Sequence, residues 1–281
     1  MITRFDHVVI AVQDLDAALI DYAQLGFDIA AGGRHPALGT RNAIVRFGLD
    51  YLELLAIEDV SLARSSGAFG ADLADFLATG SGLIGFALAS AGLDDEVSGL
   101  ARIDLAAEGP FAMQRERADG RLLSWRLLLP GGSPWRKPWP FLIEWTTADA
   151  ERLRWDGLGK HANGACAVRA IDHLFTNLEQ AARLYEDGLR LAPVAASAGA
   201  AVRSYRLGEF DLRLQEAVNN AMQDELERRG PGPFCVELAT RSLEASAAWL
   251  RQAGVDCVFN EHTIDIAPQQ AHGARLRLVE C

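Results

Sequence analysis

The sequence predicts an α+β protein in which a strand–helix–strand–strand–strand (βαβββ) repeat occurs four times. We expect the repeats to pair into two domains with curved mixed sheets, because one such repeat leaves a sheet face that it cannot cover alone. Each predicted helix opens with a capping residue or glycine, then leucine, then an acidic residue. These openings are Asp14-Leu15-Asp16, Gly92-Leu93-Asp94, Asn177-Leu178-Glu179 and Ser242-Leu243-Glu244.

The first repeat shows the periodicity most plainly. Its predicted first strand is Phe5–Val12, and Asp14 caps a helix with one apolar stripe, formed by Leu15, Ala18, Leu19, Tyr22 and Leu25. Its remaining strands are predicted at Phe27–Ala31, Asn42–Phe47 and Tyr51–Ile57.

The other three repeats follow the same order. The second has strands at Leu83–Ala89, Phe111–Arg115, Leu122–Leu128 and Phe141–Trp145. The third has strands at Val168–Phe175, Ala201–Leu207 and Phe210–Gln215, with a helix from Asn177 to Tyr185. The fourth has strands at Phe234–Thr240, Val255–Phe259, Thr263–Ile266 and Arg275–Val279, with a helix from Ser242 to Ala253. We therefore predict a first domain over 1–147, a linker over 148–165 and a second domain over 166–281.

Composition excludes several classes of function. The chain of 281 residues is 49% hydrophobic and 23% charged, which is globular composition. Its net charge of −11 argues against nucleic acid or an anionic membrane surface as a partner. The longest apolar run is too short to cross a bilayer, the N-terminus lacks a signal-peptide core, and the four cysteines form no CxxC pair, so we expect a cytoplasmic protein. The sequence has no P-loop, GxGxxG, GxSxG or HExxH motif.

The repeats, together with the segments FDHVVIAVQDLDAA, GGRHPALGTRN and YLELL, resemble the glyoxalase-like branch of the vicinal oxygen chelate superfamily. The resemblance covers almost the whole chain. It implies the strand order 1-4-3-2 in each repeat, and in many members a divalent metal held by side chains of the first and fourth strands. Other members bind a ligand without chemistry, so the fold alone does not decide the function.

Carried onto this sequence, the resemblance places candidate metal ligands at His7 and Glu53 in the first repeat and at Glu144 in the second. Gly85 stands at the remaining position and has no ligating atom, which departs from the family pattern. An imidazole and two carboxylates suit Zn, Mn, Ni or Fe(II), and the sequence does not choose among them.

The residues around Glu53 support a functional role independently of the family. Both alternating sets of Tyr51–Ile57 are apolar, so no face of this strand is an obvious solvent face. A buried carboxylate requires a cation or strong donors; the alternative is a strand end at which Glu53 reaches water. For His7, a ligand and a hydrogen-bonded core histidine remain open, and Glu144 is alternatively part of an ordinary polar-edged face.

The third and fourth repeats have lost this ligand set. Asp172-His173 looks like a copy of Asp6-His7, but the helix openings align Ala170 with His7 and place His173 on the other face. The second domain is therefore expected to support the fold, cover the site or contact another subunit.

Two further regions contribute candidate residues. In the loop from Gly32 to Asn42, His35 is a candidate proton donor or acceptor, and we expect substrate contacts from Arg34, Thr40 and Asn42, although a solvated connection is the alternative. The insertion PGGSPWRKPWP and the tryptophans near it predict a lid with an aromatic wall, or else packing on the domain's own edge. Trp125 and Trp145 are the candidate substrate-binding tryptophans.

The predicted function is that of a metal-dependent lyase, isomerase or dioxygenase-type enzyme acting on a small oxygen-bearing substrate, with Glu53 and His35 as catalytic candidates. The alternative is a non-catalytic protein of the bleomycin-resistance type that binds a small molecule. A third possibility is a scaffold or dimer module, and a homodimer is compatible with each.

Overall fold

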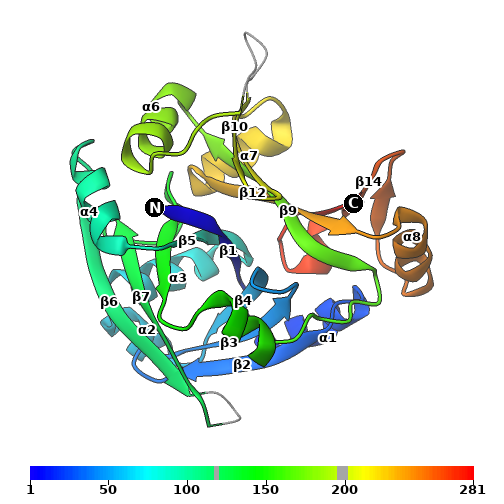
Figure 1. Cartoon of the computed structure of the whole chain (residues 1–281). Helices are drawn as coiled ribbons and strands as arrows, with labels where there is room; N and C mark the ends of the chain where they lie inside the picture. Colours follow the sequence, from blue (N-terminus) through cyan, green and yellow to red (C-terminus); the bar gives the residue numbers. More distant parts are fainter. Residues whose placement is uncertain (117–119, 195–201) are drawn as a thin grey trace. The chain divides into compact units, whose positions relative to one another are not determined.

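The computed structural model describes residues 1–116, 120–194 and 202–281. Within these residues the first two repeats comprise ten strands and helices of the predicted pattern and two additional helices (Figure 1). The first repeat contains β1 (Ile2–Ala11), α1 (Leu15–Gln24), β2 (Ile29–His35), β3 (Thr40–Arg46) and β4 (Tyr51–Ile57), followed by α2 (Val60–Ser65) and α3 (Ala68–Ala78). The second contains β5 (Gly82–Ser90), α4 (Leu93–Ala101), β6 (Ala107–Glu116), β7 (Leu122–Pro130) and β8 (Phe141–Trp145).

A short helix, α5 (Asp149–Trp155), lies in the predicted linker. The third repeat contains β9 (Ala165–Phe175), α6 (Leu178–Arg183), the π-helix η1 (Leu184–Gly188), β10 (Val202–Leu207) and β11 (Phe210–Glu216), followed by α7 (Asn220–Arg229). The fourth contains β12 (Gly232–Thr240), α8 (Leu243–Gln252), β13 (Cys257–Phe259), β14 (Thr263–Ile266), the 3₁₀ turn η2 (Pro268–Ala271) and β15 (Leu276–Glu280). Ala201, the predicted start of a strand, lies outside the described residues.

The strands form two mixed sheets, which confirms the predicted fold class. The first has the order β2-β3-β4-β1-β5-β8-β7-β6, and the second has the order β10-β11-β9-β12-β15-β14-β13. The first, second and fourth repeats therefore have the order 1-4-3-2 that the resemblance implies. In the third repeat, two strands, β10 and β11, follow the helix among the described residues.

The chain divides into two compact units, which cut across the sequence order. The His7 unit comprises His7–Ile84, Leu153–Ala170 and Cys235–Cys281, and the Gly85 unit comprises Met1–Asp6, Gly85–Arg152 and Ile171–Phe234. Each unit thus contains parts of both sequence halves. The domain boundaries proposed at 147 and 165 follow a different division and stay a prediction.

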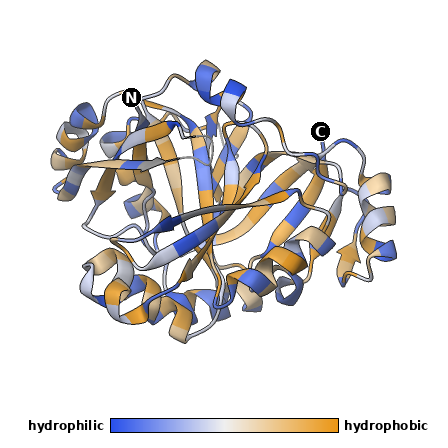
Figure 2. Cartoon of the chain, turned by 90° about the horizontal axis from the view of Figure 1, so that it is seen from below, coloured by the Kyte–Doolittle hydropathy of each residue, from blue (hydrophilic) through white to orange (hydrophobic). Residues whose placement is uncertain are grey.

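The core of the His7 unit explains why its first repeat folds as it does. One face of β1, β3 and β4 is fully buried and apolar, and α1 packs on these strands through its own apolar stripe. The buried strand residues are Val8, Ile10, Ala43, Val45, Leu52 and Leu54. Helix α1 begins where the Asp14 carboxylate accepts the N–H groups of Asp16 and Ala17. In Figure 2 the helices carry both hydrophobic and hydrophilic segments, as this one-sided burial requires.

The helices α2, α3, α5 and α7 were not predicted, because none belongs to the βαβββ pattern. Among them α3 has the largest buried face, which includes Leu73, Phe76 and Leu77. Among the described residues, none of the helices combines the length and apolar character that crossing a lipid bilayer requires.

Candidate functional site

The face of the first-repeat sheet opposite α1 carries a polar cluster. His7 pairs with Tyr51 and Val9 pairs with Glu53 in the parallel register of β1 and β4, so the His7 and Glu53 side chains project from the same face. His7 Nε2 lies 3.5 Å from Glu53 Oε2. His7 is buried and Glu53 is half-buried. The structure therefore brings these two predicted residues together.

Asn42 holds the Glu53 carboxylate. Its Nδ2 donates to Glu53 Oε1 at 2.6 Å, while its Oδ1 accepts the Gly33 N–H at 2.7 Å. The amide is anchored by the β2 backbone, where a side chain at Gly32 would collide with it: a Cβ there would lie 2.1 Å from Asn42 Oδ1. The described hydrogen bonds of Asn42 orient the Glu53 carboxylate, and the substrate contact expected of Asn42 stays a prediction.

Tyr51 and Arg46 complete this polar face. The Tyr51 ring stacks on His7 with the ring centroids 4.5 Å apart, and the Arg46 guanidinium lies 5.1 Å from the Tyr51 ring centre. The stack fixes the plane of the imidazole and leaves Nε2 directed toward Glu53. We call His7, Glu53 and Asn42 the His7–Glu53–Asn42 cluster.

The remaining loop candidates lie farther along the same strands. His35 Nδ1 and Thr40 Oγ1 are 2.9 Å apart and belong to the residue pair that closes the β2–β3 hairpin. Thr40 pairs with Ile57, four residues beyond Glu53, which corresponds to about 13 Å along a strand. Arg34 is exposed and forms an ion pair with Glu58 at 2.7 Å. These contacts support the hairpin, and the functional roles proposed for Arg34, His35 and Thr40 stay predictions.

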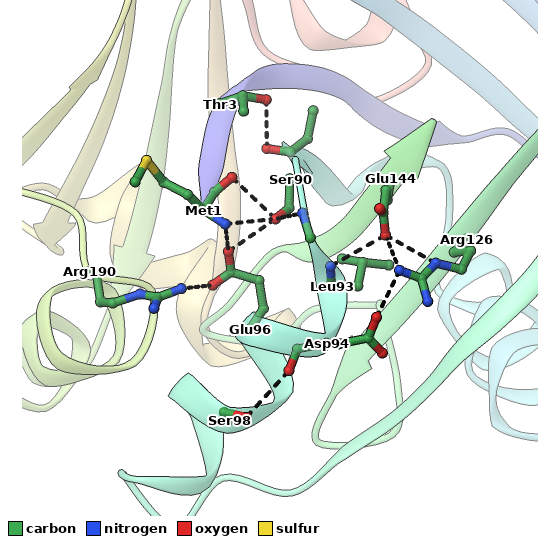
Figure 3. Close-up of polar contacts among 12 residues, drawn as sticks. Met1, Thr3, Ser90, Leu93, Asp94, Glu96, Ser98, Arg126, Glu144 and Arg190 are labelled. Atoms are coloured by element: carbon green, nitrogen blue, oxygen red, sulfur yellow. Dashed lines mark hydrogen bonds and ion pairs between the residues drawn. The ribbon is translucent and has the colours of Figure 1, made fainter. Parts of the chain in front are cut away.

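Glu144 has a different environment from Glu53. Its Oε2 accepts the N–H of Leu93, the first residue of α4, at 3.3 Å, and hydrogen bonds from Arg126 Nε at 3.0 Å and Nη2 at 2.5 Å (Figure 3). Arg126 also binds Asp94, and hydrogen bonds to Asp94 and Glu144 raise the pKa of its guanidinium. Glu144 therefore caps α4, whose N-cap residue, Gly92, has no side chain to do so.

The strand register explains this orientation. Ala89 pairs with Ile143, so Glu144 lies on the sheet face of Leu142 and Leu88, whereas Gly85 lies on the face of Ala89 and Ile143. Because side chains alternate along a strand, Glu144 and Gly85 lie on opposite faces of the sheet, whereas the family resemblance assigns both positions to one site. A shift of one residue reverses the face on which a side chain lies.

Trp135 occupies the space beside Gly85. A Cβ at Gly85 would lie 2.7 Å from the Pro134 carbonyl oxygen and 3.0 Å from Trp135 Cε3. Trp135 is buried and contacts Phe141 edge to face. Trp135 of the Pro- and Trp-rich insertion therefore packs against β5 and β8, and the lid and the packing on the domain's own edge both stay predictions.

Trp125 and Trp145 lie together on the face opposite Glu144. They pair directly across β7 and β8, with ring centroids 5.4 Å apart. Arg152 lies 3.7 Å above the Trp145 ring, and Trp145 Nε1 donates to Asp6 at 2.8 Å. Arg152 and Asp6 thus contact Trp145. That Trp125 and Trp145 contact substrate stays a prediction.

The donor set does not fit a metal centre held by three protein ligands. In the described part of the chain, no group of three or more His, Cys, Asp or Glu residues is placed to hold an ion. Glu144 is neutralised by Arg126 and used as a helix cap, and Gly85 offers no donor. His7 and Glu53 remain as two possible donors, and we derive no step through a metal.

His173 is fully buried and lies outside the polar cluster, and the expectation that it is not a ligand stays a prediction. Neither of its ring nitrogens makes a hydrogen bond of normal geometry to a described residue. Burial, reinforced by the positive charge of Arg136, lowers the pKa of His173 to about 3, although a backbone hydrogen bond with Lys137 acts in the opposite direction. Arg213, on β11, donates to Asp172 at 2.7 Å.

Sequence reasoning missed three residues that determine these environments. Arg126 is the partner of Glu144, and strand alternation from Glu144 to the neighbouring strand was the available signal. Tyr51 orders His7, and its position two residues before Glu53 indicates a shared face. Trp135 fills the Gly85 position, and no pattern in the sequence identifies which insertion residue does so.

Comparison with known proteins agrees with this architecture. Residues 5–189 match the family model described as a glyoxalase-like domain. The chain belongs to the glyoxalase-like domain family. This family lies within the vicinal oxygen chelate superfamily, whose members include metal-dependent enzymes. No protein in the comparison with curated proteins matches the sequence significantly.

Two solved structures show how far the likeness of this glyoxalase-like chain extends. A hypothetical protein from Staphylococcus aureus is similar over 100% of both chains, with a TM-score of 0.73 and 15% identity. A fusion protein of a xylose isomerase-like TIM barrel and a 4-hydroxyphenylpyruvate dioxygenase is similar over 100% of this chain and 49% of its own, with a TM-score of 0.61 and 14% identity. The chain spans about half the length of that fusion protein. At these identities the likeness shows the fold alone.

Proposed function

We propose that this glyoxalase-like protein binds a small oxygen-bearing molecule against the His7–Glu53–Asn42 cluster and transfers a proton on it, as an isomerase or lyase does. The observation that carries the proposal is the position of the Glu53 carboxylate between Asn42 and His7. One carboxylate oxygen is fixed by Asn42 at 2.6 Å, and the other lies 3.5 Å from the His7 imidazole. This separation is slightly longer than a hydrogen bond, and the contacts of catalytic acid–base groups often shorten when substrate binds, so the carboxylate and the imidazole are the proposed acid–base pair.

In this proposal Glu53 removes a proton from the carbon beside a substrate carbonyl. His7 exchanges that proton with the carboxylate through Nε2, which lies 3.5 Å from Glu53 Oε2. Asn42 keeps one carboxylate oxygen oriented and leaves the other toward His7, and the stacked Tyr51 holds the ring plane. Positioning of this kind reduces the entropy that must be lost when the reacting groups meet.

The test is incorporation of solvent deuterium into small carbonyl compounds, followed by proton NMR. The panel consists of pyruvate, dihydroxyacetone and 4-hydroxyphenylpyruvate, the last because the fusion protein of similar fold is named for it. Glu53→Gln is expected to lower the protein-dependent exchange rate by about 10²–10⁴-fold. Glu58→Gln, one residue beyond the end of β4, is the matched control and retains the rate. Equal rates for Glu53→Gln and the original protein contradict the proposal.

Elemental analysis of protein purified without chelator tests the donor-set argument. We expect sub-stoichiometric Zn, Mn, Ni and Fe that added ions do not raise, because only two side-chain donors are grouped among the described residues. One equivalent of metal that is lost in Glu53→Gln would instead support the metal-dependent enzyme expected from the sequence.

A second candidate is a protein that binds a small molecule without changing it. It is favoured by the second repeat, where Trp135 fills the position beside Gly85 and Glu144 caps α4. The same NMR samples distinguish the two candidates. Saturation transfer to a panel compound without deuterium incorporation, abolished in Glu53→Gln, identifies a binding protein.

A further inference from the structure

Two cysteines far apart in the sequence meet in the His7 unit. Cys166, the second residue of β9, and Cys281, which follows β15, have their sulfur atoms 3.2 Å apart. A disulfide requires about 2.05 Å between the sulfurs, so an approach of about 1 Å would bring them to bonding distance.

Both residues are anchored to the same end of β12. The Cys166 thiol donates to the Ala239 carbonyl at 3.4 Å, and the Cys281 N–H donates to the Thr240 carbonyl at 3.0 Å. In the second sheet, β12 lies between β9 and β15. The two thiols therefore face each other across one strand end and are held there by the backbone.

We propose that Cys166 and Cys281 form a reversible disulfide when the protein meets a low-molecular-weight disulfide such as oxidised glutathione. This bond would connect β9, directly after the linker region, to the residue that follows β15. It would close a loop whose ends are 115 residues apart in the sequence.

The chemistry is two successive thiol–disulfide exchanges. The exposed Cys281 thiolate attacks one sulfur of oxidised glutathione, forming a mixed disulfide and releasing one glutathione thiolate. Cys166 then loses its proton to solvent and attacks the Cys281 sulfur, and the second glutathione thiolate leaves. In sum, two protein thiols are oxidised to one disulfide, and oxidised glutathione is reduced to two glutathione molecules.

Cys257 provides a matched comparison within the same unit. Burial raises the pKa of both Cys166 and Cys257 to about 11, with the hydrogen bond to Cys281 contributing at Cys166. Both are half-buried, but a sulfur–sulfur contact is described for Cys166 and not for Cys257 within the described residues. The presence of a second sulfur within contact distance, and not the pKa of the thiol, therefore distinguishes Cys166 from Cys257. Because Cys281 is exposed, whereas Cys166 is half-buried and has a raised pKa, Cys281 is assigned the first attack and Cys166 the second.

The experiment is incubation of the full chain with oxidised glutathione, followed by denaturation, alkylation of free thiols and intact-mass measurement. All four cysteines are thiols in the structure. We expect the number of alkylated thiols to fall from four to two, with no glutathione retained, and to return to four after treatment with dithiothreitol. Peptide mapping is expected to show the Cys166 and Cys281 peptides linked.

Three variants make the outcome decisive. Cys166→Ser is expected to retain one glutathione on Cys281, because the second thiol is missing, and Cys281→Ser is expected to stay unlinked. Cys257→Ser forms the link as the original protein does. Retention of glutathione on the original protein without linkage, linkage of any other pair, or no reaction at Cys281 would each overturn the proposal. The melting temperature of each reduced variant verifies that it is folded.

Discussion

The first and second repeats have the same order of elements, yet each directs the carboxylate of its last strand to a different sheet face. In the first repeat, Glu53 projects away from α1 and lies beside His7 and Asn42. In the second, Glu144 projects toward α4 and accepts the Leu93 N–H. Because strand side chains alternate, a displacement of one residue is sufficient for this difference.

The helix starts explain why the second repeat uses its carboxylate in this way. Asp14 caps α1 with its own side chain, whereas Gly92 leaves the first N–H groups of α4 without a side-chain cap. Unpaired N–H groups at a helix start favour a negatively charged acceptor. The comparison teaches that a carboxylate at the end of a βαβββ repeat has a structural use wherever the helix lacks a capping residue.

The largest expected effect comes from placing a second carboxylate in the first-repeat cluster. Asn42→Asp puts two acidic groups at hydrogen-bond distance in a buried position, and we expect a loss of about 2–4 kcal/mol in unfolding free energy at pH 7. One carboxyl of the pair has its pKa raised by the other, so the loss grows as the pH rises above about 4.

Urea denaturation of Asn42→Asp at pH 7 and pH 4 measures this effect. Asn260→Asp is the matched control, because Asn260 also donates to a carboxylate, that of Asp265, but in an exposed position. We expect the control to change stability by less than about 0.5 kcal/mol. Equal losses for the two variants would show that the first-repeat cluster is open to water.

The second prediction contrasts two histidines that contact the two repeats. His161 packs against Phe27 and Phe47 and has both ring nitrogens bonded, to the Asp28 N–H and the Arg46 carbonyl, and burial lowers its pKa. His173 packs against Phe86 without such bonds, and its pKa is about 3. For both histidines the pKa is lower in the folded protein than in the unfolded chain, so the unfolded chain takes up the proton at a higher pH. The stability contributed by each neutral, buried ring is therefore complete above about pH 6.5 and is lost as the pH falls.

As the pH falls from 6 to 4, His173 is expected to lower the unfolding free energy by about 1.4 kcal/mol for each pH unit of the decrease. The pH dependence of stability is therefore expected to be shallower in His173→Phe than in the original protein. His262→Phe, which replaces an exposed histidine, is expected to leave the slope unchanged. Parallel curves for His173→Phe and the original protein would contradict this description of the buried ring.

The third prediction tests whether Pro134 and Trp135 fill the space beside Gly85 in the second repeat. Gly85→Ala forces its Cβ against the Pro134 carbonyl and Trp135, and we expect a loss of about 1–3 kcal/mol. Gly157→Ala, at a glycine whose added Cβ meets no atom within 4 Å among the described residues, is the control and is expected to be neutral. Thermal unfolding of both variants gives the comparison, and a stable Gly85→Ala would indicate that Trp135 moves aside readily.

The smallest effect concerns the helix cap. Glu144→Gln is expected to cost about 0.5–1 kcal/mol, because α4 loses its charged acceptor and Arg126 loses one partner. Gly92→Ser supplies a side-chain cap in an extended backbone conformation and is expected to add a few tenths of a kcal/mol. A double-mutant cycle in chemical denaturation checks the coupling: Gly92→Ser should reduce the cost of Glu144→Gln.

The sequence predicted the repeats, because strand periodicity and helix openings are local signals, whereas the strand order and the placement of His7 beside Glu53 were what the family resemblance implied. It did not predict the orientation of Glu144, because the helix-start alignment does not fix the register of β8: Ala87, the equivalent of Val9, pairs with Phe141, three residues before Glu144. The partner of Asn42 was also missed, since contact with Glu53 depends on the register between β3 and β4. Trp135 meets Gly85 through an irregular insertion, for which no periodicity exists.

The division of the chain into contact units has a consequence for any attempt to work with fragments. A fragment that ends at Thr147 would contain His7–Ile84 without Cys235–Cys281, and residues 85–147 without Ile171–Phe234. Both units would then expose apolar strand surface to water. Gene truncation at the linker is thus expected to yield insoluble halves, whereas co-expression of both halves allows them to reassemble.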